Sequence, residues 1–69
     1  LNSGDWTAYC YDGCMIIESE KNYDIVKVYD MKGDVTYSSS IKEGVTQLKL
    51  PQGLYIVVVG ESTRRVLIK

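Results

Sequence analysis

The chain has 69 residues and a formal net charge of −1, so it is long enough for one small domain and too short for a catalytic cleft between two lobes. Hydrophobic residues make up 45% and charged residues 25% of the chain, which is the composition of a folded domain. Basic residues are not interleaved with aromatic ones, and no apolar run approaches the roughly 18 residues of a membrane helix. Neither nucleic-acid binding nor a transmembrane segment is therefore expected.

Turn-forming residues recur about every eight to twelve residues, a spacing typical of an all-β sandwich or barrel. Between them lie runs in which apolar and polar residues alternate, as in strands with one buried and one exposed face. Seven strands are predicted, at Trp6–Tyr11, Cys14–Glu20, Tyr23–Met31, Val35–Lys42, Val45–Leu50, Leu54–Gly60 and Arg64–Lys69.

The first two predicted strands meet at Asp12-Gly13, a strong hairpin signal. If Tyr11-Asp12-Gly13 forms a three-residue turn, Cys10 and Cys14 face each other at a distance that a disulfide tolerates. If Asp12-Gly13 is a two-residue turn, Cys10 opposes Met15, the sulfurs point to opposite faces, and both thiols stay free. No His is present, so a four-ligand zinc site is not expected.

The run Leu54 to Val59 does not alternate and is apolar throughout. Both faces of this strand therefore favour burial, which predicts a central position in its sheet. Before it, Pro51 fixes φ and Gly53 admits positive φ, so Pro-Gln-Gly is predicted to form a turn.

No arrangement of polar residues in the chain is typical of catalysis, so neither an enzymatic activity nor a cofactor is expected. The spacing of the carboxylates selects no acid–base pair, and Ser38-Ser39-Ser40 has no His partner for activation. The carboxylates considered are Glu18, Glu20, Asp24, Asp30 and Asp34. Tyrosines on an exposed sheet face could form a flat sugar-binding platform, although cross-strand packing is the plainer interpretation. These tyrosines are Tyr9, Tyr11, Tyr23, Tyr29, Tyr37 and Tyr55.

Three motifs occur in order along the chain: VKVYDMKGDVTYS at residues 26–38, LPQGLYIVVV at 50–59 and RRVLIK at 64–69. Together they resemble the C-terminal sorting domain of the type IX (Por) secretion system of Bacteroidetes. In that family a Val-Tyr-Asp strand with a following Gly precedes a Pro-x-Gly-x-Tyr strand and a final apolar strand that ends in Lys or Arg. WTAYCYDGCMIIES at residues 6–19 stands where many members have a Pro-Asn-Pro segment.

The resemblance implies an immunoglobulin-like antiparallel β-sandwich of about seven strands without catalytic residues. It implies that residues 1–69 are the C-terminal piece of a larger secreted protein, which crosses the periplasm and is read by an outer-membrane translocon. A sortase-like enzyme would then remove the domain and attach the cargo to the cell surface. The motif carries over at Val28, Tyr29, Asp30, Gly33, Pro51, Gly53, Tyr55, Val57, Arg65, Val66 and Lys69.

Other functions are also compatible with the sequence. A carbohydrate-binding or adhesin-type sandwich, or a structural spacer of a secreted protein, would have the same strand pattern. In the last strand, Arg64, Arg65 and Lys69 would form part of the sorting signal, or they would protect a sheet edge from aggregation. An exposed terminal strand would also allow an edge-strand dimer.

Overall fold

The computed structural model describes residues 5–69, and all regular structure in them is β-strand. The seven predicted strands are confirmed, each to within two residues at either end. They are β1 (Trp6–Tyr11), β2 (Cys14–Ser19), β3 (Tyr23–Tyr29), β4 (Val35–Ile41), β5 (Gly44–Lys49), β6 (Gly53–Val59) and β7 (Ser62–Ile68). Leu1, at which the domain was expected to begin, lies outside the described residues.

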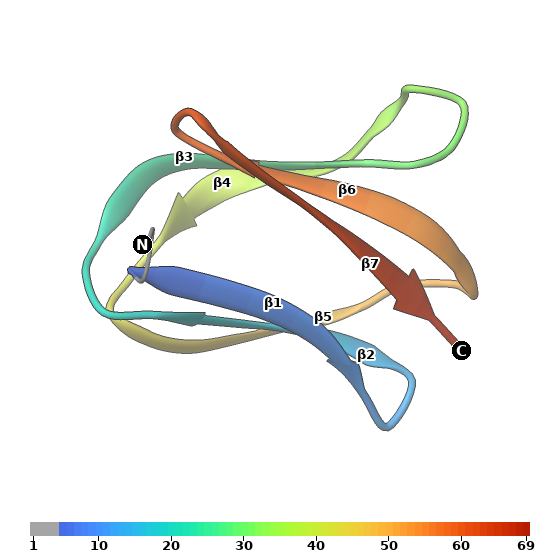
Figure 1. Cartoon of the computed structure of the whole chain (residues 1–69), viewed down its shortest axis with the longest axis horizontal. Coiled ribbons are helices and arrows are strands. Elements are labelled where there is room, and N and C mark those ends of the chain that lie inside the picture. Colours follow the sequence, from blue (N-terminus) through green and yellow to red (C-terminus); the bar gives the residue numbers. More distant parts are fainter. Residues whose placement is uncertain (1–4) are drawn as a thin grey trace.

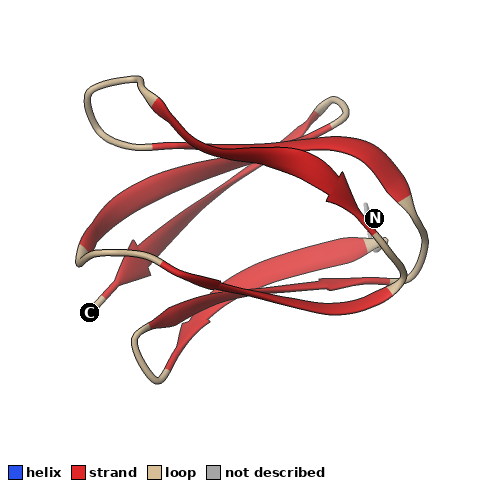
Figure 2. Cartoon of the chain, turned by 180° about the vertical axis from the view of Figure 1, so that it is seen from behind, coloured by secondary structure: helices blue, strands red, loops and turns tan. Residues whose placement is uncertain are grey.

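The strands form two antiparallel sheets that pack face to face (Figures 1 and 2). One sheet has the order β1-β2-β5, and the other has the order β4-β3-β6-β7. Strand β4 pairs with β3, so it belongs to the four-stranded sheet rather than beside β5. The expected immunoglobulin-like β-sandwich is therefore confirmed.

The core fills the space between the two sheets, because alternate residues of each strand point inward. Met15 and Ile17 from β2 are fully buried there against Val26, Val28 and Val57 from the opposite sheet. The remaining core residues are Trp6, Ile41, Tyr55, Val59, Val66 and Ile68.

Strand β6 is central, as its uninterrupted apolar run predicts, since it lies between β3 and β7. Its inward residues Tyr55, Val57 and Val59 are buried. Leu54, Ile56 and Val58 point the other way and are only half-buried. No element of the described chain forms a layer over this second apolar face, which is therefore partly in contact with solvent.

The β1–β2 turn has two central residues. Asp12 and Gly13 have φ values of 53° and 76°, as a type I′ hairpin turn requires. Tyr11 consequently pairs with Cys14, and Cys10 pairs with Met15. Because neighbouring residues of a strand point to opposite faces, the two sulfurs lie on opposite sides of the sheet. The alternative of a three-residue turn with a Cys10–Cys14 disulfide is therefore wrong, and both cysteines are free.

The two thiols should differ in reactivity. Cys14 is buried and Cys10 is only half-buried, so a thiol reagent should modify Cys10 first in the native protein. After unfolding, the two thiols should react at similar rates. Mass spectrometry of the labelled peptides would measure this, and equal native rates would contradict the burial of Cys14.

Candidate functional site

Two of the four residues of the first motif, Asp30 and Gly33, build the turn between β3 and β4. Val28 belongs to the core. The Asp30 Oδ1 atom accepts hydrogen bonds from the backbone nitrogens of Lys32, at 2.9 Å, and Asp34, at 3.0 Å. The Gly33 nitrogen donates to the Asp30 carbonyl at 3.0 Å. Asp30 and Gly33 therefore have a local structural role, because a carboxylate that accepts from nearby backbone groups fixes a turn.

The second motif forms a tyrosine corner. The Tyr55 hydroxyl donates a hydrogen bond of 2.8 Å to the carbonyl of Pro51, four residues earlier. The Tyr55 ring is only 5% exposed. This arrangement at the start of the sixth strand is a feature of immunoglobulin-like sandwiches. The Gly53 φ of 152° is disfavoured for residues with a Cβ, so Pro51, Gly53 and Tyr55 together direct the chain into β6.

The third motif divides between the core and the surface. Val66 is buried, whereas Arg65 and Lys69 are exposed. Of the motif residues that the resemblance identified, only three are left for contacts with another molecule. Tyr29 and Arg65 lie on the sheet surface, and Lys69 lies just after the last strand. The others fold the domain.

Strand pairing aligns two of these surface residues. Tyr29 pairs with Ile56, and Ile56 pairs with Arg65. Paired residues of antiparallel strands point to the same side, so the three side chains form one row across β3, β6 and β7. We call the outward side of these three strands the outer face; its paired residues are Lys27, Tyr29, Leu54, Ile56, Val58, Thr63, Arg65 and Leu67.

The outer face combines apolar and basic side chains. Leu67 is 51% exposed, and Ile25, beside this face, is 62% exposed. Lys27 and Arg65 are its charged residues, and none of its eight paired residues is acidic. Near one end a depression of about 290 Å³ is lined by Ile25, Lys27, Tyr29, Val58 and Gly60. Such a surface suits a partner with apolar groups and negative charge.

Sequence reasoning missed Lys27, Ile56 and Leu67 as members of this surface. Their signal was present, because they occupy alternate positions of their strands. The register between strands was needed to place them beside Tyr29 and Arg65.

The outward side of the three-stranded sheet carries two exposed tyrosines. Tyr9 and Tyr11 are 39% and 69% exposed, and they pair across the sheet with Ile16 and Cys14. The Tyr9 hydroxyl donates to Glu18 at 2.5 Å. This bond to a carboxylate stabilises the protonated phenol and raises the pKa of Tyr9 above its ordinary value.

Three of the other tyrosines pack within the fold, and Tyr29 lies on the outer face. Tyr23 and Tyr37 lie against the core, and Tyr55 is part of it. The six tyrosines therefore do not gather into one binding surface.

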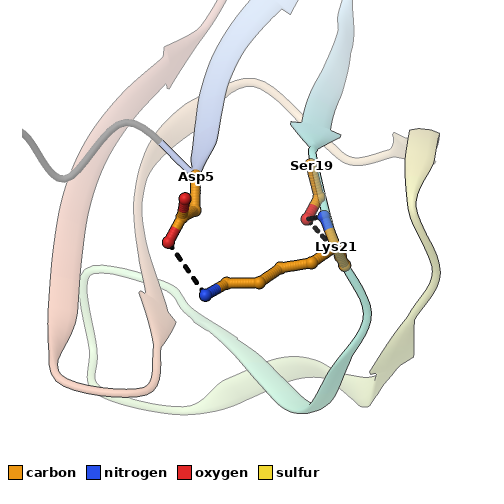
Figure 3. A network of polar contacts seen from close by, with 3 residues as sticks. All are labelled: Asp5, Ser19 and Lys21. Atoms are coloured by element: carbon orange, nitrogen blue, oxygen red, sulfur yellow. Dashed lines mark hydrogen bonds and ion pairs between the residues drawn. The ribbon is translucent and has the colours of Figure 1, made fainter.

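A second depression, of about 530 Å³, lies at the start of β1. Asp5, Glu18 and Glu20 line it together with Thr7 and Val45. The Asp5 carboxylate forms a 3.0 Å ion pair with Lys21, and the Lys21 backbone nitrogen donates a hydrogen bond of 3.2 Å to Ser19 Oγ (Figure 3). These contacts join the start of β1 to the loop after β2.

The five carboxylates considered from the sequence do not come together in one place. Glu18 and Glu20 share the depression near β1, whereas Asp30 and Asp34 lie at the β3–β4 turn and Asp24 is exposed on β3. Across residues 5–69 there is no group of three His, Cys, Asp or Glu side chains that could hold a metal ion. Ser38, Ser39 and Ser40 are exposed on β4.

Comparison with known proteins adds no identity: no family model, no curated protein and no solved structure matches the chain significantly. Among the described residues there is no helix long and apolar enough to span a membrane.

Proposed function

We propose that the chain is a non-catalytic sorting domain of the type IX secretion kind, and that its outer face is the surface that the secretion machinery reads. The observation that carries this proposal is the row Tyr29–Ile56–Arg65. Two of its members are motif residues with no part in the core. They come from motifs far apart in sequence, and strand pairing places them on either side of Ile56, on the same face of the sheet.

The outer face has the properties of a recognition surface. Partly exposed Leu54, Ile56 and Val58 supply apolar area that would gain from burial. Tyr29 and Arg65 are residue types enriched at binding hot spots. An outer-membrane translocon subunit that presents an apolar patch with acidic residues at its rim would complement this face. Cleavage by a sortase-like enzyme would then release the domain from its cargo at the cell surface.

Deletion of residues 64–69 is an unsuitable test of this function, because it would remove core residues Val66 and Ile68, which are 4% and 2% exposed. Outward substitutions avoid this problem. We would fuse residues 1–69 to a periplasmically directed reporter in a bacterium that has type IX machinery. The test variant carries Tyr29→Ser and Arg65→Glu.

The opposite sheet offers a closely matched control. Tyr11, Cys14 and Lys49 also form a cross-strand row of an aromatic, an apolar and a basic residue. Tyr11→Ser with Lys49→Glu makes the same change of charge and removes the same aromatic ring on that sheet. We expect the test variant to reduce surface-located reporter at least about tenfold, a loss of about 1.4 kcal/mol of binding, and the control to leave it unchanged. Equal export of both variants would overturn the assignment of the outer face.

Carbohydrate binding is the second candidate function, and the exposed pair Tyr9 and Tyr11 favours it. Ile16 and Cys14 also point outward between these tyrosines and β5, yet they are only 7% and 9% exposed. Side chains of neighbouring strands must therefore lie over them, which is consistent with tyrosine rings that lie flat along the sheet. A flat aromatic surface beside Glu18 and Gln47 would suit a sugar ring with its hydroxyl groups. Glycan-array binding that is lost in Tyr9→Ala/Tyr11→Ala would support this function, and the absence of binding would exclude it for the glycans tested.

A further inference from the structure

The sandwich has four edge strands, and three of them are protected. Strand β7 lies beside β1, and the Arg64 guanidinium sits 5.3 Å from the centre of the Trp6 ring, which links these two edges. Strand β5 ends at Lys49 and is followed by Leu50 and Pro51. Lysine and proline at an edge hinder the addition of another strand.

Strand β4 has neither form of protection. Its sequence Val-Thr-Tyr-Ser-Ser-Ser-Ile contains no charged residue and no proline. Within residues 5–69 it pairs with β3 alone. Val35 is 50% exposed, and Thr36 and the three serines are exposed as well. The side of β4 away from β3 therefore offers a row of main-chain donors and acceptors to an added strand.

The ends of β4 carry opposite charges. Asp34 precedes the strand, and Lys42 follows it. If two copies of β4 run antiparallel, the Asp34 end of each strand meets the Lys42 end of the other. A two-fold interface would thus form two equivalent ion pairs around a neutral centre, and no like charges would oppose each other along the strand.

We propose that β4 is a homodimerisation edge, at which β4 pairs antiparallel with β4 of a second copy about a two-fold axis at Ser38. Tyr37 then opposes Ser39 of the second copy, and both residues face the inner side, since Tyr37 pairs with core residue Val28 and Ser39 with core residue Val26. The two four-stranded sheets join into one continuous sheet. The β-bulge at Thr36 lies outside the three central residues.

This proposal does not depend on the sorting function, because it concerns the free main-chain edge of β4. Ser38 and Val35 of β4 pair with Lys27 and Tyr29 at the border of the outer face, but the side chains that define that face belong to β3, β6 and β7. It also changes the strand at which an edge dimer is expected. The exposed terminal strand was the expected edge, but β7 lies beside β1, and among residues 5–69 β4 is the edge that remains open.

Sedimentation equilibrium between about 10 µM and about 1 mM protein tests the proposal, because short edge interfaces give weak dimers. We expect the molar mass of the intact chain to rise toward that of a dimer. Ser38→Lys places two ammonium groups together at the axis and should leave a monomer. Gln47→Lys, the same charge on exposed β5, should dimerise like the original chain. A wild-type monomer at 1 mM would overturn the proposal, as would a dimer that Ser38→Lys leaves intact.

Charge reversal provides a test that misfolding cannot imitate. Asp34→Lys alone gives a strand with two basic ends, and Lys42→Asp alone gives one with two acidic ends. Each variant should dimerise about tenfold more weakly than the original chain, but an equimolar mixture should form a heterodimer, since every end then meets the opposite charge. If the mixture stays monomeric while the wild type dimerises, the β4 register is wrong.

Discussion

Replacing Tyr55 with alanine is expected to destabilise the domain by roughly 3 to 5 kcal/mol. The ring is only 5% exposed in the core, and its hydroxyl donates to the Pro51 carbonyl. The substitution therefore leaves a cavity and an unpaired carbonyl at the corner that leads into β6. A domain of this size has a total stability of only about 3 to 10 kcal/mol, so a large part of the population should unfold.

Tyr55→Phe separates the two contributions, because it keeps the ring and removes only the hydroxyl. We expect it to cost about 1 to 2 kcal/mol, the effect of losing one hydrogen bond whose acceptor stays partly buried. Urea titrations of the wild type and both variants give the free energies of unfolding. A loss below about 1 kcal/mol for Tyr55→Ala would contradict the tyrosine corner.

The second large effect is expected at Val57, which is fully buried on the inner side of β6. Val57→Asp places a carboxylate among Val28 and other apolar side chains without a partner. Burial of an unpaired charge is among the few changes that cost more than about 4 kcal/mol, so this variant should not fold stably.

Ile56→Asp is the matched control, because it makes a similar change one residue earlier in the same strand. Ile56 points to the outer face and lies opposite Arg65. The new carboxylate would remain in water beside a guanidinium, so we expect a cost of about 1 kcal/mol. Circular dichroism during thermal unfolding measures both. Equal destabilisation by the two substitutions would show that the outer face is covered, contrary to the structure.

The fold was predictable from the sequence wherever the physical signal is local. Asp12-Gly13 predicts a hairpin, alternation marks the buried valines of β3, and the uninterrupted run after Gly53 identifies the central strand. Pro51 and Gly53 also predicted a turn, although the hydrogen bond from Tyr55 that completes it needs a contact four residues away, which composition and spacing do not specify.

Features that depend on strand register were not predictable in this way. Whether Cys10 opposes Cys14 or Met15 depends on one residue in the turn, and a shift of one residue decides whether the two cysteines lie on the same face of the sheet or on opposite faces. The row Tyr29–Ile56–Arg65 depends on two separate registers, one on each side of β6. Likewise, the alternation of apolar and polar residues does not indicate whether β4 pairs with β3 or with β5, because either pairing buries the same side chains.

The structure also changes what the motifs mean. Asp30 and Gly33 form a turn, Pro51 and Tyr55 form the corner, and Val57 and Val66 fill the core. An unrelated sandwich could need the same residues for folding alone. The proposed sorting function therefore depends on half-buried Tyr29 and exposed Arg65, with exposed Lys69 after β7, rather than on the full length of the motifs.

The most direct test of the proposed sorting function is the location of a fluorescent reporter fused to intact residues 1–69. The fusion would be expressed in a bacterium with type IX machinery and in the same strain lacking the outer-membrane translocon. We expect reporter at the cell surface or in the medium of the first strain and in the periplasm of the second. Folded reporter that stays in the periplasm of both strains would contradict the sorting function.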